Sequence, residues 1–197
     1  MHIENHKEEV PFSYYADLFS KADPAKMASR TGAAFDGNAF SVTLLGVTYR
    51  VEHPGAVITP EAPLPKQTFL LRYLLEGKQV AATGNYLTFR EMPWGELYIK
   101  PYTGRVLTRA AFTFGTRLAA FRKAAETLGG TPVGHGDAGY AFSFIDDYTV
   151  QILVWEGDEE FPPNAQVLYS DNFAEGFAPE DRVVAGDILI SHIKAAM

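Results

Sequence analysis

Four carboxylates lie within five residues, directly after an apolar segment that ends at Trp155: Glu156, Asp158, Glu159 and Glu160. Carboxylates gathered in a turn could bind a hard cation such as Ca²⁺ or Mg²⁺, or act as acid–base groups. Their spacing does not fit an EF-hand loop. A solvated acidic loop is the favoured interpretation, ahead of a docking surface for Arg or Lys and of a metal site. Trp155 is most simply a core anchor at the end of a strand, or else the apolar floor of a ligand pocket.

A second group of residues with chemical potential surrounds Arg90 and includes Glu91, Trp94 and Tyr98. An exposed arginine among aromatic side chains could hold a carboxylate or phosphate in a bidentate fork while a planar ligand stacks. The favoured alternative is that Arg90 pairs inside the fold, with a neighbouring glutamate or with the acidic turn. A cleft lined by both Arg90 and Trp155 would favour ligand binding, whereas a buried salt bridge from Arg90 to the acidic turn would make both segments structural.

Two further arginines, Arg105 and Arg109, are spaced one helical turn apart and therefore point the same way on a helix. With Lys100 and Tyr102 at the start of that helix they could cradle an anion. A solvated basic face is the favoured alternative.

Neither the histidines nor any known catalytic motif indicates a reaction. His2 and His6 have an i, i+4 spacing near the terminus, and His135 lies beside Asp137 in a glycine-rich loop. A loop histidine without a chemical role is the favoured interpretation of His135. The chain contains no nucleophile elbow, phosphate-binding loop, dinucleotide fingerprint or zinc-protease motif. The sequence therefore indicates no catalytic residue and identifies neither a metal nor a cofactor.

Composition excludes several classes of protein. The chain has no cysteine, which rules out disulfides, thiolate zinc sites, cysteine nucleophiles and cysteine-ligated iron–sulfur clusters within it. A net charge of −7 argues against general nucleic-acid binding. No apolar stretch approaches the roughly 18–20 residues that span a bilayer, and the first residues lack the apolar core of a signal peptide. We expect a cytoplasmic protein with a small-molecule or protein partner, of undetermined oligomeric state.

Charge is unevenly distributed along the chain. Residues 100–123 carry six basic side chains and no acid, whereas residues 134–197 carry twelve acids against one arginine and one lysine. The favoured interpretation is that two halves of one domain face each other with opposite charge. The alternative is a basic cleft for an anionic ligand.

The hydrophobic pattern predicts an α+β fold in one domain over residues 1–197, with 1–10 a frayed segment. Antiparallel hairpins form a mixed or antiparallel sheet, packed with several helices. Helices are predicted at residues 11–21, 24–31, 65–75, 104–114, 116–128 and from Pro179 onward. Strands are predicted at residues 40–44, 47–52, 86–91, 96–100, 140–144, 150–154 and 166–170.

Two hairpin registers follow from side-chain sorting. A Leu45-Gly46 turn pairs Phe40 with Val51 and puts six apolar side chains on one face. In the second hairpin we expect a three-residue loop at 146–148, which pairs Phe142 with Ile152. A two-residue loop would instead set Phe142 against Gln151.

Three parts of the chain resemble a known family. They are residues 89–95 with 102–105, the Trp-Glu-Gly-Asp-Glu-Glu-Phe-Pro block at 155–162, and residues 167–172 leading to 179–181. Over nearly its whole length the chain resembles the domain-of-unknown-function family 3786 of anaerobic bacteria and archaea, which has no established reaction. Some relatives carry a four-cysteine iron–sulfur segment like that of corrinoid proteins, so the resemblance implies a role near corrinoid or one-carbon metabolism. A cysteine-free chain holds no such cluster, and a redox role would need a partner.

Three functions remain in competition. The first is a non-catalytic binding or accessory protein that holds a planar or anionic ligand, or a partner protein, between segment 89–109 and the turn at 155–161. The second is an enzyme that uses the acidic turn for acid–base or metal-assisted chemistry. The third is a structural subunit whose charged faces mediate assembly. The missing catalytic motifs favour the first and third.

Overall fold

The structure is a computed structural model that describes the backbone of residues 6–197 and the side chains of residues 11–197. The chain divides into two compact units, one up to Gln79 and one from Val80 onward. The spaced pair His2 and His6 lies outside the described side chains. Whether the chain is one domain, as its length suggests, stays a prediction.

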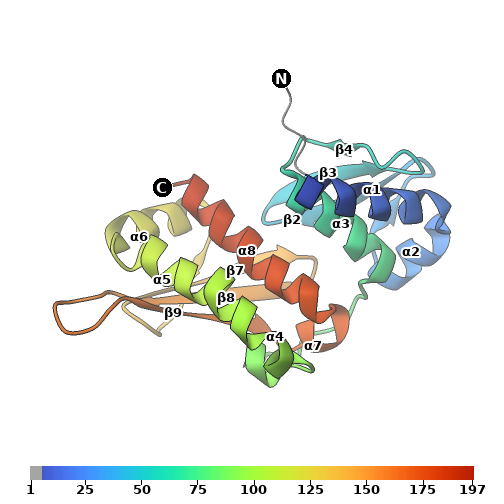
Figure 1. Cartoon of the computed structure of the whole chain (residues 1–197). Helices are drawn as coiled ribbons and strands as arrows, with labels where there is room; N and C mark the ends of the chain where they lie inside the picture. Colours follow the sequence, from blue (N-terminus) through green and yellow to red (C-terminus); the bar gives the residue numbers. More distant parts are fainter. Residues whose placement is uncertain (1–5) are drawn as a thin grey trace. The chain divides into compact units, whose positions relative to one another are not determined.

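Within residues 6–79, the first unit combines three helices with an antiparallel group of short strands (Figure 1). Its elements are α1 (His6–Lys21), α2 (Pro24–Thr31), β1 (Ala34–Phe35), β2 (Ala39–Leu44), β3 (Val47–Glu52), β4 (Ile58–Thr59) and α3 (Leu64–Glu76). The strands lie in the order β1-β2-β3-β4. Helix α1 begins at His6, so residues 6–10 belong to it rather than to a segment before it.

The sequence signals of this unit act as expected. Asp23 caps α2, because its Oδ1 accepts the N–H of Ala25 at 2.9 Å, and Gly32 ends the helix with a left-handed φ of 74°. In the first hairpin Phe40 pairs with Val51, as predicted. The predicted register is therefore confirmed.

The second unit is a longer antiparallel sheet with helices on one face (Figure 1). Its elements are β5 (Tyr86–Thr88), a 3₁₀ turn η1 (Phe89–Glu91), α4 (Gly95–Tyr102), a π-helical segment η2 (Thr103–Thr108), α5 (Arg109–Phe114), α6 (Leu118–Thr127), β6 (Thr131–Pro132), β7 (Ala138–Ile145), β8 (Tyr148–Trp155), β9 (Asn164–Ser170), α7 (Phe173–Gly176) and α8 (Pro179–Ala195). The strand order is β6-β7-β8-β9-β5, with every pair antiparallel.

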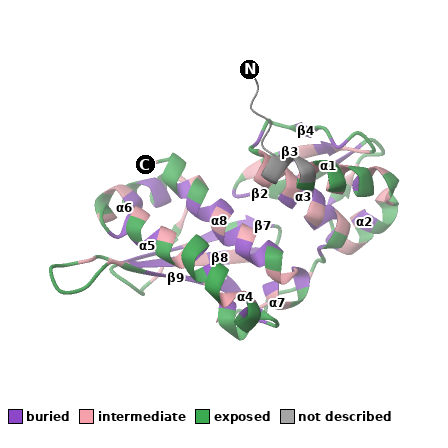
Figure 2. Cartoon of the chain, viewed as in Figure 1, coloured by how far each residue is buried: buried purple, intermediate pink, exposed green. Residues whose placement is uncertain are grey.

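The core of this unit lies between the sheet and the layer formed by η2, α5 and α8. Buried residues line the strands and the inward sides of these helices (Figure 2). Tyr169 of β9 is fully buried, and its hydroxyl donates to the backbone oxygen of Arg182 in α8 at 3.0 Å. Antiparallel strands and separately grouped helices make this an α+β protein, as predicted.

Residues 96–100 are helix α4, so the predicted strand there is wrong. The chain reverses at Trp94, whose φ of 66° is left-handed, and a helix starts at Gly95. Strand β5 is also shorter than predicted, because Glu91 closes a capping box on Thr88. Its Oε2 accepts both the N–H and the hydroxyl of Thr88 at 2.7 Å.

The predicted register of the second hairpin is also wrong. Phe142 pairs with Val150, not with Ile152, and Ile145 pairs with Tyr148 across a two-residue turn. A bulge between Ser143 and Ile145 absorbs the extra residue. The shift is two positions, so each apolar side chain keeps its face of the sheet.

In the part of the chain that the structure describes, the helices are too short or too polar to cross a lipid bilayer.

Candidate ligand-binding site

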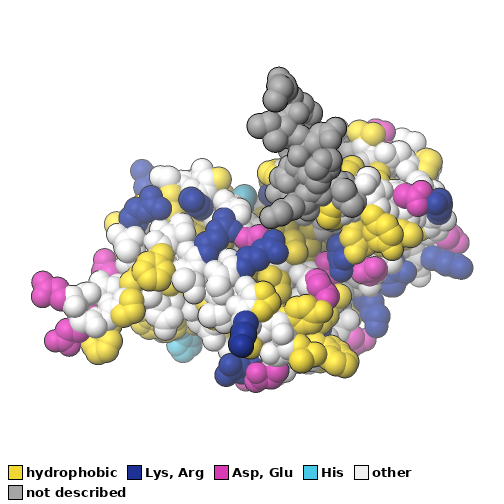
Figure 3. Space-filling view, viewed as in Figure 1, with side chains coloured by type: hydrophobic (Ala, Val, Ile, Leu, Met, Phe, Trp, Pro, Cys, Tyr) yellow, Lys and Arg dark blue, Asp and Glu magenta, His cyan; other side chains and the backbone are white. Residues whose placement is uncertain are grey.

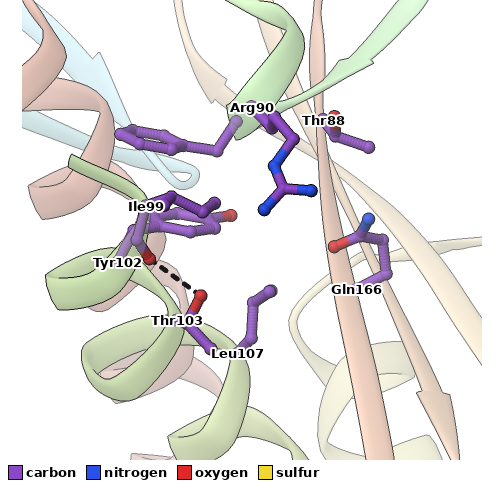
Figure 4. A pocket seen from close by; sticks show the side chains of 8 residues that line it. Thr88, Arg90, Ile99, Tyr102, Thr103, Leu107 and Gln166 are labelled. Atoms are coloured by element: carbon purple, nitrogen blue, oxygen red, sulfur yellow. Dashed lines mark hydrogen bonds between the residues drawn. The ribbon is translucent and has the colours of Figure 1, made fainter. Parts of the chain in front are cut away.

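A hollow of about 360 Å³ opens beside strand β9, where η1 and the helical run α4–η2 border it (Figure 4). Its lining residues are Thr88, Phe89, Arg90, Ile99, Tyr102, Thr103, Leu107 and Gln166. Ile99, Thr103 and Leu107 come from successive turns of one helical run, since their i, i+4 spacing puts them on one side. Gln166 faces them from β9. Apolar and hydrogen-bonding side chains therefore converge on one space.

Arg90 is the one charged group of this lining, and its guanidinium hangs between Tyr102 and Gln166 (Figure 4). The capping box at Thr88 fixes the turn that carries it. Phe89 anchors the same turn, because its ring stacks on that of Tyr102 at 4.0 Å. The backbone N–H of Thr88, followed by its hydroxyl, lowers the pKa of Glu91. Glu91 is thus a structural capping residue rather than a ligand-binding one in this arrangement.

Arg90 is only loosely held by the protein. Its Nε lies 3.3 Å from Oε1 of Glu96, and the two side chains are 62% and 69% exposed. An exposed pair of this kind contributes about 0–1 kcal/mol. Arg90 is therefore available to an anion that enters the hollow.

The Tyr102 hydroxyl is buried and has no partner in hydrogen-bond geometry. Among residues 11–197, it is the one buried side-chain polar atom of which this is true. Burial, and then the neighbouring Tyr169 hydroxyl, raise the pKa of Tyr102 well above its usual value. The two hydroxyls nevertheless do not meet in hydrogen-bond geometry. The hydroxyl is closed off from the open part of the hollow, so Tyr102 contributes its ring, not a hydrogen-bonding group, to the lining.

Three other predicted site residues are tied to helix α8. Asp187 accepts from Arg105 at 2.7 Å and 3.0 Å, and it also pairs with Arg109. Arg109 donates to Ser191 at 3.0 Å as well. Tyr98 donates to Glu180. Lys and Arg side chains gather over this helical face of the unit (Figure 3), but these two arginines are neutralised internally. At Asp187, an acid of the segment 134–197 faces two arginines of the segment 100–123, which is the favoured interpretation of the uneven charge.

The acidic turn is held by hydrogen bonds from its own backbone. The Asp158 carboxylate accepts the N–H of Glu160 at 2.8 Å and that of Phe161 at 2.7 Å, and these bonds lower the pKa of Asp158. The Glu156 N–H donates to Asp137 at 2.8 Å. Within residues 11–197, no three Asp, Glu or His side chains gather in an arrangement that could hold a metal ion.

Trp155 lines a second hollow of about 430 Å³, together with Glu156, Phe161, Pro162, Pro163 and Asn164. This hollow shares no lining residue with the one at Arg90. Arg90 thus neither pairs with the acidic turn nor shares a cleft with Trp155. Each hollow does include one residue of β9, Gln166 or Asn164, and these are two positions apart.

The sequence reasoning missed the residues that complete the Arg90 hollow. Trp94, which was expected to line it, is 68% exposed and does not. Gln166 was overlooked, although an amide side chain within an alternating apolar strand is a usable signal. Ile99 and Leu107 look like ordinary core residues in the sequence.

The comparisons with known proteins identify a family. No curated protein and no solved structure matches the chain. A family model described as a domain of unknown function, DUF3786, matches residues 23–192. This match takes in both units and every residue of the two hollows. The chain therefore belongs to the DUF3786 family.

Proposed function

We propose that this protein is a non-catalytic binding protein that holds a small anionic ligand in the hollow at Arg90. The ligand's carboxylate or phosphate would meet the guanidinium, and an apolar or planar body would lie against Ile99 and Leu107. The observation that carries this proposal is one weakly paired arginine aimed into an otherwise uncharged hollow.

One polar side chain of the hollow supports the same assignment. The Gln166 amide has N–H groups that could orient an anion once it is bound, whereas the hydroxyls of Thr88 and Thr103 already donate to Glu91 and to the backbone oxygen of Ile99. Arg90 is the one charged residue of the lining, so no second charged side chain of the hollow competes with it for a bound anion.

The volume limits the size of the ligand. Ligand pockets usually measure about 300–1,000 Å³, and a hollow of about 360 Å³ is at the lower end. A corrinoid is several times larger and would insert only one edge or side chain. The proposal therefore favours a small metabolite over an enclosed tetrapyrrole.

The cellular setting is part of the proposal. The family resemblance supports an accessory role in anaerobic metabolism, near corrinoid or one-carbon chemistry, and we place the protein in the cytoplasm. Without cysteine it would act beside a redox partner rather than carry a cluster itself.

The test is to identify what the protein carries. Wild type is purified natively from an anaerobic host and analysed by native mass spectrometry, beside Arg90→Gln and the control Arg117→Gln. Arg117 is an exposed arginine that lines neither hollow. We expect an anionic small molecule on wild type and on Arg117→Gln, and its loss from Arg90→Gln. Equal loading of all three proteins would refute the site.

A further inference from the structure

Strand β9 has an open edge next to the hollow. On one side it pairs with β8 from Asn164 to Tyr169. On the other side β5 covers only its last part, where Thr88 lies opposite Leu168. Within the described residues, no strand pairs with residues 164–167 on that side. The edge is open because the capping box turns the chain away after Thr88.

The backbone groups of Ala165 and Val167 point toward this open edge. The N–H of Asp171 donates to Asn85 on the β5 side at 3.0 Å. Backbone groups alternate along a strand, so Tyr169, Val167 and Ala165 face the same side as Asp171. Two unused ladder positions therefore continue directly from β5.

The two N–H groups at this edge are held only by amide side chains of the preceding residues. Asn164 Oδ1 accepts the N–H of Ala165 at 2.8 Å, and Gln166 Oε1 accepts that of Val167 at 3.3 Å. The second distance exceeds the usual range for an N–H···O bond. Local side-chain bonds of this kind stand in for a neighbouring strand and can be exchanged for one.

The two hollows flank the open edge. Gln166 lines the hollow with Arg90, and Asn164 lines the hollow with Trp155. In an added strand, side chains two positions apart lie on one face and stand beside these two residues. A single extended segment would thus place one side chain at each hollow.

We infer that an extended segment of a partner protein adds to β9 as a new antiparallel strand, with an acidic side chain at Arg90 and an apolar side chain two residues later at Trp155. The backbone supplies affinity, and the two hollows supply selectivity. Arg90 attracts the acid, whereas Glu156 at the second hollow disfavours one and the aromatic Trp155 and Phe161 favour an apolar group. This inference rests on the proposed function, since both use Arg90 as the anion-binding group of the hollow, and it extends the anions bound there to the carboxylate of a protein side chain.

The direction of the segment follows from β5. Because β5 is antiparallel to β9, its continuation meets Gln166 before Asn164. The probe is therefore the peptide acetyl-Thr-Glu-Val-Leu-Thr-amide, whose Glu faces Gln166 and whose Leu faces Asn164. Its Val then lies opposite Ala165 and exchanges hydrogen bonds with it.

Calorimetry of four peptides with the full chain tests the backbone pairing. Methylation of the Val amide nitrogen removes a ladder bond and should weaken binding about tenfold. Methylation of the Glu amide, which points away from β9, is the matched control and should change little. Replacing Glu by Lys should weaken binding by about fivefold or more. Equal binding of all four peptides overturns the inference.

Protein variants test the same contact from the other side. Arg90→Glu should bind the Glu peptide more weakly and the Lys peptide more tightly than wild type does. A misfolded variant would bind neither peptide, so this exchange of preference excludes misfolding as its cause. Ala165→Pro removes one edge N–H, which edge strands tolerate, and should weaken binding about tenfold. Hydrogen exchange at Ala165 and Val167 should slow when the peptide saturates wild type.

Other outcomes separate this inference from the proposed function. If no peptide binds but small anions still bind at Arg90, strand addition is wrong and the proposed function stands. If neither binds, both fail. If light scattering shows a dimer of wild type that Ala165→Pro converts to a monomer, a second copy of this chain occupies the edge and the partner class inferred here is wrong.

Discussion

The Nε of Arg90 lies 3.3 Å from Oε1 of Glu96, and this exposed pair is the internal competitor for any anion in the hollow. Glu96→Gln removes the competing charge and leaves the side chain's shape. We expect affinity for phenyl phosphate to rise about twofold to fivefold, because exposed pairs are worth at most about 1 kcal/mol. Calorimetry measures this change. Glu76→Gln, which frees Arg72 from its ion pair in the first unit, is the control and should leave affinity unchanged. Weaker binding by Glu96→Gln would contradict the assignment of Arg90.

Asp187 joins η2 and α5 to α8 through both Arg105 and Arg109, and its side chain is only 20% exposed. Asp187→Asn should lower the free energy of unfolding by about 1–2 kcal/mol, since it leaves two arginines without their shared carboxylate. Urea denaturation measures this loss. The control is Asp17→Asn, which breaks a pair with Lys21 whose side chains are 59% and 70% exposed, and it should cost under about 0.5 kcal/mol. Equal effects would show that Arg105 and Arg109 are solvated and free to bind a ligand.

Most of the local structure could be predicted from the sequence, but the register of the second hairpin could not. The first register follows from a tight turn at Leu45-Gly46, because a one-residue slip would break the sorting of six apolar side chains onto one face. The second hairpin contains a bulge near Phe144. Pairing Phe142 with Ile152 or with Val150 preserves the same alternation, so side-chain sorting cannot distinguish the two. The strand predicted at residues 96–100 was wrong for a related reason, because an apolar pattern over five residues suits a helix as well as a strand.

The candidate site was predictable only in part. Arg90 can be recognised in the sequence because it is a charged residue among aromatic ones. Asp187, the partner of Arg105 and Arg109, cannot be recognised, since it is about eighty residues away in the sequence and is one acid among many. The open edge of β9 depends on where β5 ends. That end is set by the Thr88–Glu91 capping box, whereas the residue pattern predicted a strand that continues to residue 91.

Asp36 gives the stability of the first unit a dependence on acid. Its pKa is lowered from 3.8 to about 2, first by the Arg50 side chain at 2.6 Å and then by the N–H groups of Ala39 and Asn38. The folded state therefore binds fewer protons than the unfolded state between these two values, and stability falls as pH falls from about 4 to about 2. The melting temperature of Asp36→Asn should lie below that of wild type above pH 4, and the gap should close near pH 2. A gap that persists below pH 2 would show that charge is not its cause.

Gly95 allows the turn that carries Arg90. A Cβ at this position would lie 2.1 Å from the backbone oxygen of Phe89. Gly95→Ala should therefore cost about 2 kcal/mol or more of stability and weaken phenyl phosphate binding, because the turn must open. Gly104→Ala is the matched control. Its Cβ meets nothing within 4 Å, and it should stabilise the helical run by about 0.5–1 kcal/mol. Thermal melts with and without phenyl phosphate measure both effects, and unchanged binding by Gly95→Ala would show that the turn does not position Arg90.

The central claim is that Arg90 and β9 border one recognition site, and an NMR titration tests it most directly. Phenyl phosphate is added to isotope-labelled wild type while the Arg90 Nε–H and the Gln166 side-chain amide resonances are followed. The account predicts saturable shifts at both groups with one dissociation constant, and their disappearance in Arg90→Gln. Shifts that centre on Arg105 and Arg109 while Arg90 and Gln166 stay unchanged would contradict it.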